Sequence, residues 1–378
     1  MRIENAELYF LEIPFRLSIT HGARAGRTFS DSVVLRVTSG KHNCYGEAVV
    51  RDYVSGSLGT GDLFQSEAAR ITSTLLAPLR DRDLSWQEAQ SHLSALACDT
   101  SSLPLLCAVE SALLACAAEE AACDPYSVLG VGPERTVVVF GGALPMFPLE
   151  LAGKYIEMCA ALGMSNLKVK VGADLAYNEA IMALCRQRLG DGCDIRVDAN
   201  AAWTGSDVDA QMKICARYGV RVIEQPFPTA LAFSNAKLVQ AGFLVMADEG
   251  VLTSLDVRSL ASSGLAQMIN LRLSKNGGLS RVLALAREAE ACGLSYQLGC
   301  MVGETGILSS LGRLAASLLP KPVYVEGGYD DILLQQNITV PSFGFGQGGK
   351  APVVRKPGIG YQVDEAALLK FSRARLPV

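Results

Sequence analysis

The chain has 378 residues, of which 49% are hydrophobic and 19% charged, and its formal net charge is -4. This composition is typical of a compact folded protein and excludes an intrinsically disordered one. Because the charge is slightly negative and no long basic run occurs, nucleic-acid binding has no electrostatic support.

The start of the chain, MRIENAELYFLEIPF, lacks the basic end and apolar core of a signal peptide. The longest apolar stretch, residues 103–123, is interrupted by Glu110, Glu119 and Glu120, which argues against a membrane span. The eleven cysteines are scattered without a C-x-x-C pair. We therefore expect a cytoplasmic protein with reduced thiols, and neither a disulfide framework nor a zinc site.

The first 130 residues change from strand patterns to helical ones. Residues 4–15, 32–38 and 44–48 alternate apolar and polar side chains, which predicts a small antiparallel meander. Loops are expected at residues 21–27 and after residue 50. From about residue 62 to residue 130 the apolar side chains recur with helical period.

From residue 137 onward, strand and helix patterns alternate regularly. Helical runs such as 175–189, 206–218 and 279–292 separate the strands. Eight such units favour an α/β fold, a TIM-type barrel of seven to eight βα units. The predicted strands are Val137–Gly141, Leu167–Val171, Asp194–Asp198, Val220–Glu224, Leu244–Asp248, Met268–Leu273, Ser295–Gly299 and a weaker Pro322–Glu326. We place the barrel at residues 131–355, and expect the tail 356–378, with a helix at 364–372, to return to the domain formed by residues 1–130.

Two lysines lie two residues apart in the second of these strands. Side chains alternate along a strand, so Lys168 and Lys170 share a face. Their mutual repulsion and partial burial are expected to lower the pKa of at least one, and a lysine tuned in this way can act as a base. The alternative is an edge strand with two solvated lysines.

The following strands end in charged residues one βα unit apart. Asp198, Glu224, Asp248 and Lys275 follow Lys170 at successive spacings of 24 to 28 residues. This periodicity predicts that all five meet at the carboxyl-terminal mouth of the barrel. Three close carboxylates require a cation, and their oxygens select Mg²⁺, with Mn²⁺ as a stand-in, over zinc. A divalent cation and a lysine base suit removal of a proton next to a carboxylate.

These motifs together resemble the enolase superfamily, in its muconate-lactonizing (muconate cycloisomerase-like) subgroup. The resemblance covers nearly the whole chain and implies that Asp198, Glu224 and Asp248 are metal ligands, that Lys170 and Lys275 are acid/bases, and that Lys168 tunes Lys170. It also implies an α+β capping domain whose loops near residues 20–30 and 50–57 close over the barrel. The motifs are Lys168-x-Lys170, Val197-Asp198-Ala199-Asn200, Ile223-Glu224-Gln225-Pro226, Ala247-Asp248-Glu249 and Lys275-Asn276-Gly277-Gly278.

The histidines narrow the chemistry. His21, His42 and His92 all precede the barrel, so a barrel histidine base, as in the mandelate-racemase-like subgroup, is excluded. We expect racemisation or epimerisation of an amino-acid derivative or dipeptide, with deprotonation by one lysine and reprotonation by the other. The alternatives are a cycloisomerase or a β-elimination dehydratase resembling succinylbenzoate synthase, a Schiff-base aldolase, and a non-catalytic metal-stabilised binding protein.

Substrate contacts are less sharply indicated. The segment 299–301 resembles dipeptide epimerases, whereas residues 325–331 depart from the Asp-x-Asp that those enzymes usually carry. Beside the ligands, Asn200 is expected to contact a ligand, and Glu249 either orients a lysine or caps a helix. We also expect a homo-oligomer that binds a small carboxylate substrate and neither nucleic acid nor membrane. Further candidates around the substrate are Cys300 as a packing residue, Glu304 near the substrate carboxylate or as a helix-terminal acid, Arg24 and Arg27 as anion-binding or solvated loop residues, and Tyr53 as a pocket wall.

Overall fold

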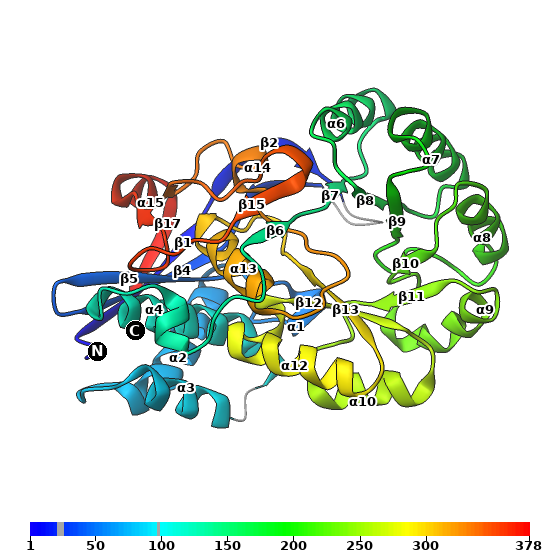
Figure 1. Cartoon of the computed structure of the whole chain (residues 1–378). Helices are drawn as coiled ribbons and strands as arrows, with labels where there is room; N and C mark the ends of the chain where they lie inside the picture. The colour runs from blue at the N-terminus through cyan, green and yellow to red at the C-terminus, as the bar shows by residue number, and fades with distance from the viewer. Residues whose placement is uncertain (21–25, 97–98) are drawn as a thin grey trace.

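A curled parallel sheet forms the centre of the protein. The computed structural model describes residues 1–20, 26–96 and 99–378. Seven strands pair in chain order, and Figure 1 shows them ringed by helices α6 to α10. Their bounds are β7 (Gly142–Leu144), β8 (Asn166–Lys170), β9 (Asp194–Asp198), β10 (Val222–Glu224), β11 (Leu244–Ala247), β12 (Met268–Arg272) and β13 (Ser295–Gly299). All run parallel, so their carboxyl ends lie at one mouth.

The gap between the first and last of these strands is closed by residues 324–326. Val325 forms a parallel bridge with Leu298 of β13, and its carbonyl oxygen accepts a hydrogen bond of 2.8 Å from the backbone N–H of Gly141. The predicted strand at 322–326 is therefore a single bridge and not a regular strand, yet it completes the barrel.

The predicted first barrel strand is wrong. Residues Val137–Val139 form β6, which pairs antiparallel with β15 (Lys350–Pro352) outside the barrel sheet. Val137 and Val139 are about 40% exposed (41% and 42%), because alternate side chains of this ribbon face solvent. The true first strand is the short β7, and the strands 194–198 and 295–299 have the bounds that the sequence predicts.

Helices cover the outside of the sheet. In α12, buried side chains recur every three or four residues and face the barrel. Several helices start at capping side chains, as α10 does at Thr253. The helices of this part are α6 (Leu149–Ala161), α7 (Leu175–Leu189), α8 (Val208–Arg217), α9 (Asn235–Gln240), α10 (Ser254–Ser263), α11 (Leu273–Asn276), α12 (Leu279–Ala291), α13 (Gly306–Leu318), α14 (Asp330–Leu333) and the 3₁₀ turns η3 (Thr229–Ser234) and η4 (Gln347–Gly349).

The N-terminal layer, as we call the part formed by residues 1–130, is a second, antiparallel sheet with helices. The sheet order is β17-β1-β4-β5, so the last strand of the chain pairs with the first, and both termini lie at this end in Figure 1. Its elements are β1 (Asn5–Leu11), β2 (Ile13–Ile19), β3 (Arg27–Ser30), β4 (Val33–Ser39), β5 (His42–Ala48), α1 (Asp52–Ser55), α2 (Gly61–Leu76), η1 (Ala77–Leu79), α3 (Trp86–Ala95), η2 (Thr100–Ser102), α4 (Leu103–Glu120) and α5 (Pro125–Leu129). The elements of the tail are β16 (Gln362–Val363), which pairs with β14 (Thr339–Val340), α15 (Glu365–Phe371) and β17 (Ser372–Pro377).

One sequence expectation changes here. Residues 4–15 form two strands and not one, because β2 leaves the sheet and pairs with β3 as a separate hairpin. The domain boundaries at residues 130 and 355 stay predictions.

Helix α4 lies at the junction between this layer and the barrel. It packs on β4 and β5 on one side and on α11 and α12 on the other. Within the described ranges, the segment Thr100–Glu120 is the single helical stretch long and apolar enough to cross a membrane, and most of it is buried inside the protein. All ten described cysteines are free, while Cys98 lies outside the described residues.

Candidate active site

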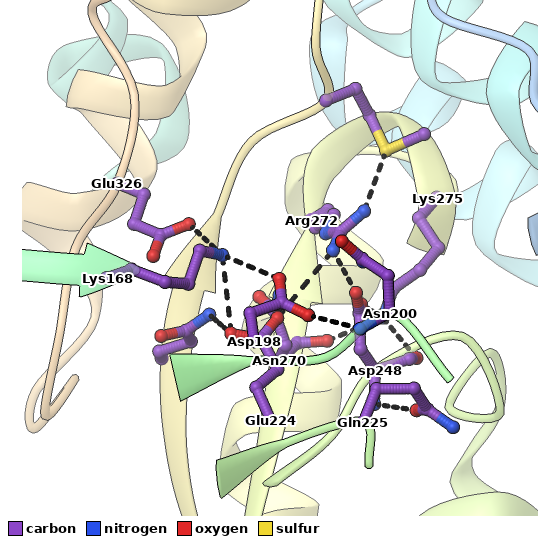
Figure 2. Close-up of polar contacts among 12 residues, drawn as sticks. Lys168, Asp198, Asn200, Glu224, Gln225, Asp248, Asn270, Arg272, Lys275 and Glu326 are labelled. Atoms are coloured by element: carbon purple, nitrogen blue, oxygen red, sulfur yellow. Dashed lines mark hydrogen bonds and ion pairs between the residues drawn. The ribbon is translucent and has the colours of Figure 1, made fainter. Parts of the chain in front are cut away.

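Three carboxylates converge at the carboxyl ends of neighbouring strands. Asp198 ends β9 and pairs in register with Glu224, which ends β10, and Asp248 directly follows β11. All three are fully buried, at 0% exposure. Figure 2 shows them side by side, with Lys168 approaching from one side and Lys275 from the other. The one-unit spacing in the sequence therefore translates into contact in space.

Two lysines from β8 hold the first two carboxylates. Lys170 Nζ donates to Asp198 Oδ2 at 2.6 Å, and Lys168 Nζ lies 3.5 Å from the same oxygen. Lys168 also donates to Glu224 Oε2 at 3.3 Å and pairs with Glu326 Oε2 at 2.6 Å. Both lysines therefore face the barrel interior, which excludes the alternative of solvated lysines on an edge strand.

The third carboxylate is held by two cations, Arg272 at the end of β12 and Lys275 in α11 directly after it. Lys275 Nζ donates to Asp248 Oδ1 at 3.1 Å, to the Asp248 carbonyl at 2.8 Å and to the Asn270 carbonyl at 2.6 Å. Arg272 forms an ion pair with Asp248, and its Nη2 lies 3.7 Å from Glu224 Oε1. Each of the three carboxylates thus contacts at least one cation that comes from a strand or turn other than its own.

Burial and charge separate the pKa values in this cluster. Burial disfavours the charged form of Asp198, but Lys170 and Lys168 outweigh it and hold its pKa below the usual range. Burial and the neighbouring Asp198 raise the pKa of Glu224 to about 7. Burial opposes the charged form of Lys168 as well, but Glu224, Glu326 and Asp198 raise its pKa. Burial lowers the pKa of Lys275. The expected lowering by lysine–lysine repulsion is therefore wrong for Lys168, because three carboxylates surround it.

Sequence reasoning missed several polar residues in the barrel interior. Glu326 accepts from Lys168 and also pairs with the fully buried Arg196, whose guanidinium lies 4.1 Å from the centre of the Tyr324 ring. A signal for them existed. Glu326 ends the last predicted strand, and Arg196 and Arg272 stand on the faces of their strands that also carry Asp198 and Asn270, two residues away.

The donor set fits a hard divalent cation by its chemistry. Its oxygens come from carboxylates. Two amide oxygens beside Glu224, Asn270 Oδ1 and Gln297 Oε1, are buried and have no hydrogen-bond partner within residues 1–20, 26–96 and 99–378. Both amides donate to Glu224, at 2.7 Å and 3.3 Å. Among the described residues no group of three or more His, Cys, Asp or Glu stands at metal-binding geometry, because cations occupy the carboxylate oxygens. Binding of a metal would therefore require these cation contacts to loosen.

A cavity of about 150 Å³ borders the cations that hold the carboxylate cluster. Its described lining does not include the fully buried Asp198, Glu224, Asp248 and Lys275. Lys168, Lys170 and Arg272 line its charged end. Leu17 and Ile19 of β2 are among the apolar side chains of its wall, together with Phe147, Ile332 and Leu333. The predicted contact residues Tyr53, Asn200, Glu249, Cys300 and Glu304 all line this cavity, whereas Arg24 lies outside the described residues.

The lining residues differ in how firmly they are held. Asn200 Oδ1 accepts a 2.7 Å hydrogen bond from Lys170. Glu249 Oε2 is buried with no hydrogen-bond partner in the part of the chain that the structure describes, and burial raises the pKa of Glu249 to about 7. The helix-cap alternative for Glu249 is wrong, because Thr253 and Asp256 form the capping box of α10.

Glu304 lies on the loop after β13. Its Oε1 accepts a 2.7 Å hydrogen bond from the backbone N–H of Met301, and burial raises the pKa of Glu304 to about 8. The N-cap of α13 is its neighbour Thr305, whose side chain accepts from Ile307. Glu304 is therefore a half-buried acid that faces the cavity.

Comparison with known proteins gives the same family as the motifs. Residues 150–367 match the family model described as enolase C-terminal domain-like. The chain is 32% identical to a hydrophobic dipeptide epimerase of Enterococcus faecalis over 45% of its own length and 48% of the relative. It is 30% identical to muconate cycloisomerase 1 of Pseudomonas putida over 54% of its length and 55% of the relative. The alignments thus span about half of these two curated relatives.

The fold is shared over the whole chain. A crystal structure of a dipeptide epimerase from Enterococcus faecalis, complexed with Mg and the dipeptide L-Leu-L-Tyr, superposes with a TM-score of 0.81. It covers 96% of this chain and 100% of that one at 20% identity, a likeness that concerns the fold. The relatives named here are isomerases. The chain belongs to the enolase C-terminal domain-like family, as a member of the muconate-lactonizing branch of the enolase superfamily.

Proposed function

We propose that the protein is a Mg²⁺-dependent isomerase that removes the proton α to a substrate carboxylate and returns one to the opposite face. The substrate is an amino-acid derivative or a dipeptide, which is thereby racemised or epimerised. The observation that carries this proposal is the placement of two lysines around one carboxylate cluster. Lys170 comes from β8 and Lys275 from the turn after β12, and the three strands between them contribute Asp198, Glu224 and Asp248.

The metal ligands in this proposal are Asp198, Glu224 and Asp248, with Mn²⁺ as an acceptable substitute for Mg²⁺. When bound, the cation supplies positive charge that offsets the negative charge created as the α-proton leaves. Lys170 lines the cavity, while Lys275 and the three acids are fully buried and are not among its described lining residues. In this proposal, a bound carboxylate reaches an amine on each side once the cation contacts of the cluster loosen.

The residues around Lys275 and Lys170 give these two amines different environments. Burial lowers the pKa of Lys275, which favours the neutral amine that a base requires. Lys170 is oriented by Asp198 and by Asn200, whose oxygens accept its protons at 2.6 and 2.7 Å. Lys168 stays a cation between Asp198, Glu224 and Glu326, where it limits the negative charge beside Lys170.

The cavity wall supports a substrate with a single carboxylate. Away from the carboxylate cluster, the described lining is apolar except for hydroxyl, thiol and carboxyl groups, including Glu304 and Asp330, and carries no lysine or arginine. Arg27, a candidate for binding a second anion, pairs instead with Asp31 at 2.5 Å. A dicarboxylate would place its second charge against apolar and acidic groups, which disfavours muconate-type lactonisation.

Cycloisomerisation, supported by the 30% identity to a muconate cycloisomerase, is the second candidate, and β-elimination is possible chemistry on the same residues. Both require one base only. The three matched carboxylates speak against a Schiff-base aldolase, because that chemistry would leave them without a role. The proposal also keeps the sequence-based expectations of a cytoplasmic homo-oligomer.

Solvent-deuterium exchange tests the proposal. Wild type is incubated in D₂O with Mg²⁺ and a library of N-acyl amino acids and dipeptides of both configurations. We expect deuterium at the α-carbon of both stereoisomers. Lys170→Ala and Lys275→Ala should each retain exchange for one stereoisomer and lose interconversion. Lys154→Ala is the control, since Lys154 is an exposed residue of α6 that pairs with Glu150.

Three results would count against the proposal. Loss of exchange for both stereoisomers in each single variant would exclude separate faces. Full activity in EDTA would exclude the metal requirement. A borohydride-trapped adduct on Lys170 would point to aldolase chemistry.

A further inference from the structure

The two proposed acid/bases are held in different ways. Lys170 is part of β8, which has a strand on each side in the sheet. Lys275 lies in α11, a helix of only four residues that ends at Gly277 and Gly278, with φ angles of +86° and +108°. A single turn of helix has little stability of its own, so contacts from elsewhere must fix the Lys275 backbone.

The first such contact comes from the end of β5. The backbone N–H of Val49 donates to Ser274 Oγ at 2.8 Å, and Ser274 Oγ donates to the Val49 carbonyl at 3.1 Å. Ser274 is the residue immediately before Lys275 and is fully buried. The N-terminal layer is thereby tied to the backbone next to the base.

The second contact comes from Glu110 of α4. Its carboxylate accepts from the backbone N–H of Ser280 at 3.1 and 3.3 Å, which caps the start of α12. A Cβ atom at Gly278 would collide with Glu110 Oε2, so the carboxylate lies directly against the Gly278 backbone. Glu110 is buried in a helix whose other buried side chains are nearly all apolar. A buried acid in that position requires its hydrogen bonds.

We propose that Glu110 is a positioning residue for Lys275. By capping α12 and bracing the Gly277–Gly278 turn, it sets the backbone that carries Lys275 toward the carbonyls of Asp248 and Asn270. Through Glu110 and the contact of Val49 with Ser274, the N-terminal layer therefore acts on the base that serves one face of the substrate. This inference rests on the proposed two-lysine function, because the face that it affects is the one that Lys275 serves.

The chain offers a matched control in Glu47. This residue, also fully buried and from the same layer, caps a neighbouring barrel helix: it accepts from Thr305 N at 2.9 Å and from Leu308 N at 3.1 Å at the start of α13. Glu47→Ala removes the same kind of contact between the same two parts of the protein. These hydrogen bonds of Glu47 go to residues 305 and 308 and not to the turn that carries Lys275.

The first measurement needs no substrate. Backbone hydrogen exchange is followed in the full-length protein for residues 273–280 and 166–172. In Glu110→Ala we expect about fivefold to tenfold faster exchange at 273–280, the size expected for a lost helix cap, and no change at 166–172. Glu110→Gln keeps one acceptor oxygen and should restore most of the protection. Ser274→Ala tests the same turn from its other side if Glu110→Ala does not fold.

The second measurement uses L-alanyl-L-leucine and L-alanyl-D-leucine as probes, with Mg²⁺ in D₂O. Glu110→Ala should slow α-exchange of the stereoisomer that depends on Lys275 at least tenfold more than that of the other. Glu47→Ala should change both rates by the same factor. Equal slowing in Glu110→Ala, or unchanged protection of 273–280, would overturn the positioning role. Failure of wild type to exchange either probe would count against the proposed function with these dipeptides, while the hydrogen-exchange result would still decide the role of Glu110.

Discussion

Replacement of Arg272 by methionine probes how the metal site is built. The guanidinium is largely buried, pairs with Asp248, lies 3.7 Å from Glu224 Oε1 and donates to Met301 Sδ at 3.5 Å. The guanidinium therefore places a positive charge beside two of the three proposed metal ligands. Methionine keeps much of the side-chain length and removes the charge.

Two effects of opposite sign follow from this change. Without metal, removal of one partner from a buried ion pair costs about 3–5 kcal/mol of unfolding free energy. With metal, the cation no longer competes with a guanidinium whose attraction at 3.7 Å is on the order of 4 kcal/mol at an effective dielectric constant of about 20. Even a third of that energy corresponds to roughly tenfold tighter metal binding.

Thermal unfolding with EDTA and with increasing Mg²⁺ measures both effects. Arg272→Met should unfold at lower temperature than wild type in EDTA and gain more than wild type from the same Mg²⁺ concentration, by about 1.4 kcal/mol for each tenfold gain in affinity. Arg196→Met is the matched control, because it removes another buried guanidinium, one that pairs with Glu326 and not with a proposed ligand. A Mg²⁺-dependent gain in Arg272→Met equal to or below that of wild type would refute the reasoning.

Two pH predictions follow from acids whose pKa is raised by burial. Since the pKa of Glu304 is raised to about 8, its ionisation places a negative charge in the cavity above that pH, and KM for a carboxylate substrate should rise there in wild type but stay flat in Glu304→Gln; parallel profiles would contradict this. Burial raises the pKa of Glu47 to about 7, so the folded state binds its proton more tightly than the unfolded state. Stability contributed by this group is full below about pH 4.5 and is lost as pH rises to about 7, by about 3 kcal/mol. Denaturant unfolding at pH 5 and pH 8 should show this loss in wild type and not in Glu47→Gln, and an equal loss in both would exclude Glu47 as its source.

Local pattern was enough to predict the centre of the site. The carboxyl ends of successive parallel strands share one edge, so a charged residue at each end, one βα unit apart, specifies a cluster without any knowledge of distances. Asp198, Glu224, Asp248 and Lys275 meet on this basis, together with Lys170. The same period-two reading, applied to the rest of each strand, would also have found Arg196 and Arg272.

Local sequence patterns fail to predict features that depend on a distant partner residue or strand. An apolar run such as Val137–Val139 predicts a strand but does not indicate the strand with which it pairs. In the structure this strand pairs with Lys350–Pro352, more than two hundred residues away. The direction of the pKa shift of Lys168 depends likewise on Glu326, which lies in the last segment of the barrel along the chain. Pairing and charge compensation are non-local, and sequence period carries no information about them.

The sequence by itself thus determined the barrel and the charged cluster at its mouth, because strand period and unit spacing are local and repeat. The family followed from the resemblance of its motifs. Only the tertiary structure decided what surrounds those residues: the cations on each carboxylate, the apolar wall from β2, and the link from Glu110 and Val49 to the turn that bears Lys275. The contacts of Glu110 and Val49 join residues 170 and 225 positions apart, and they arise when the N-terminal layer packs against the barrel.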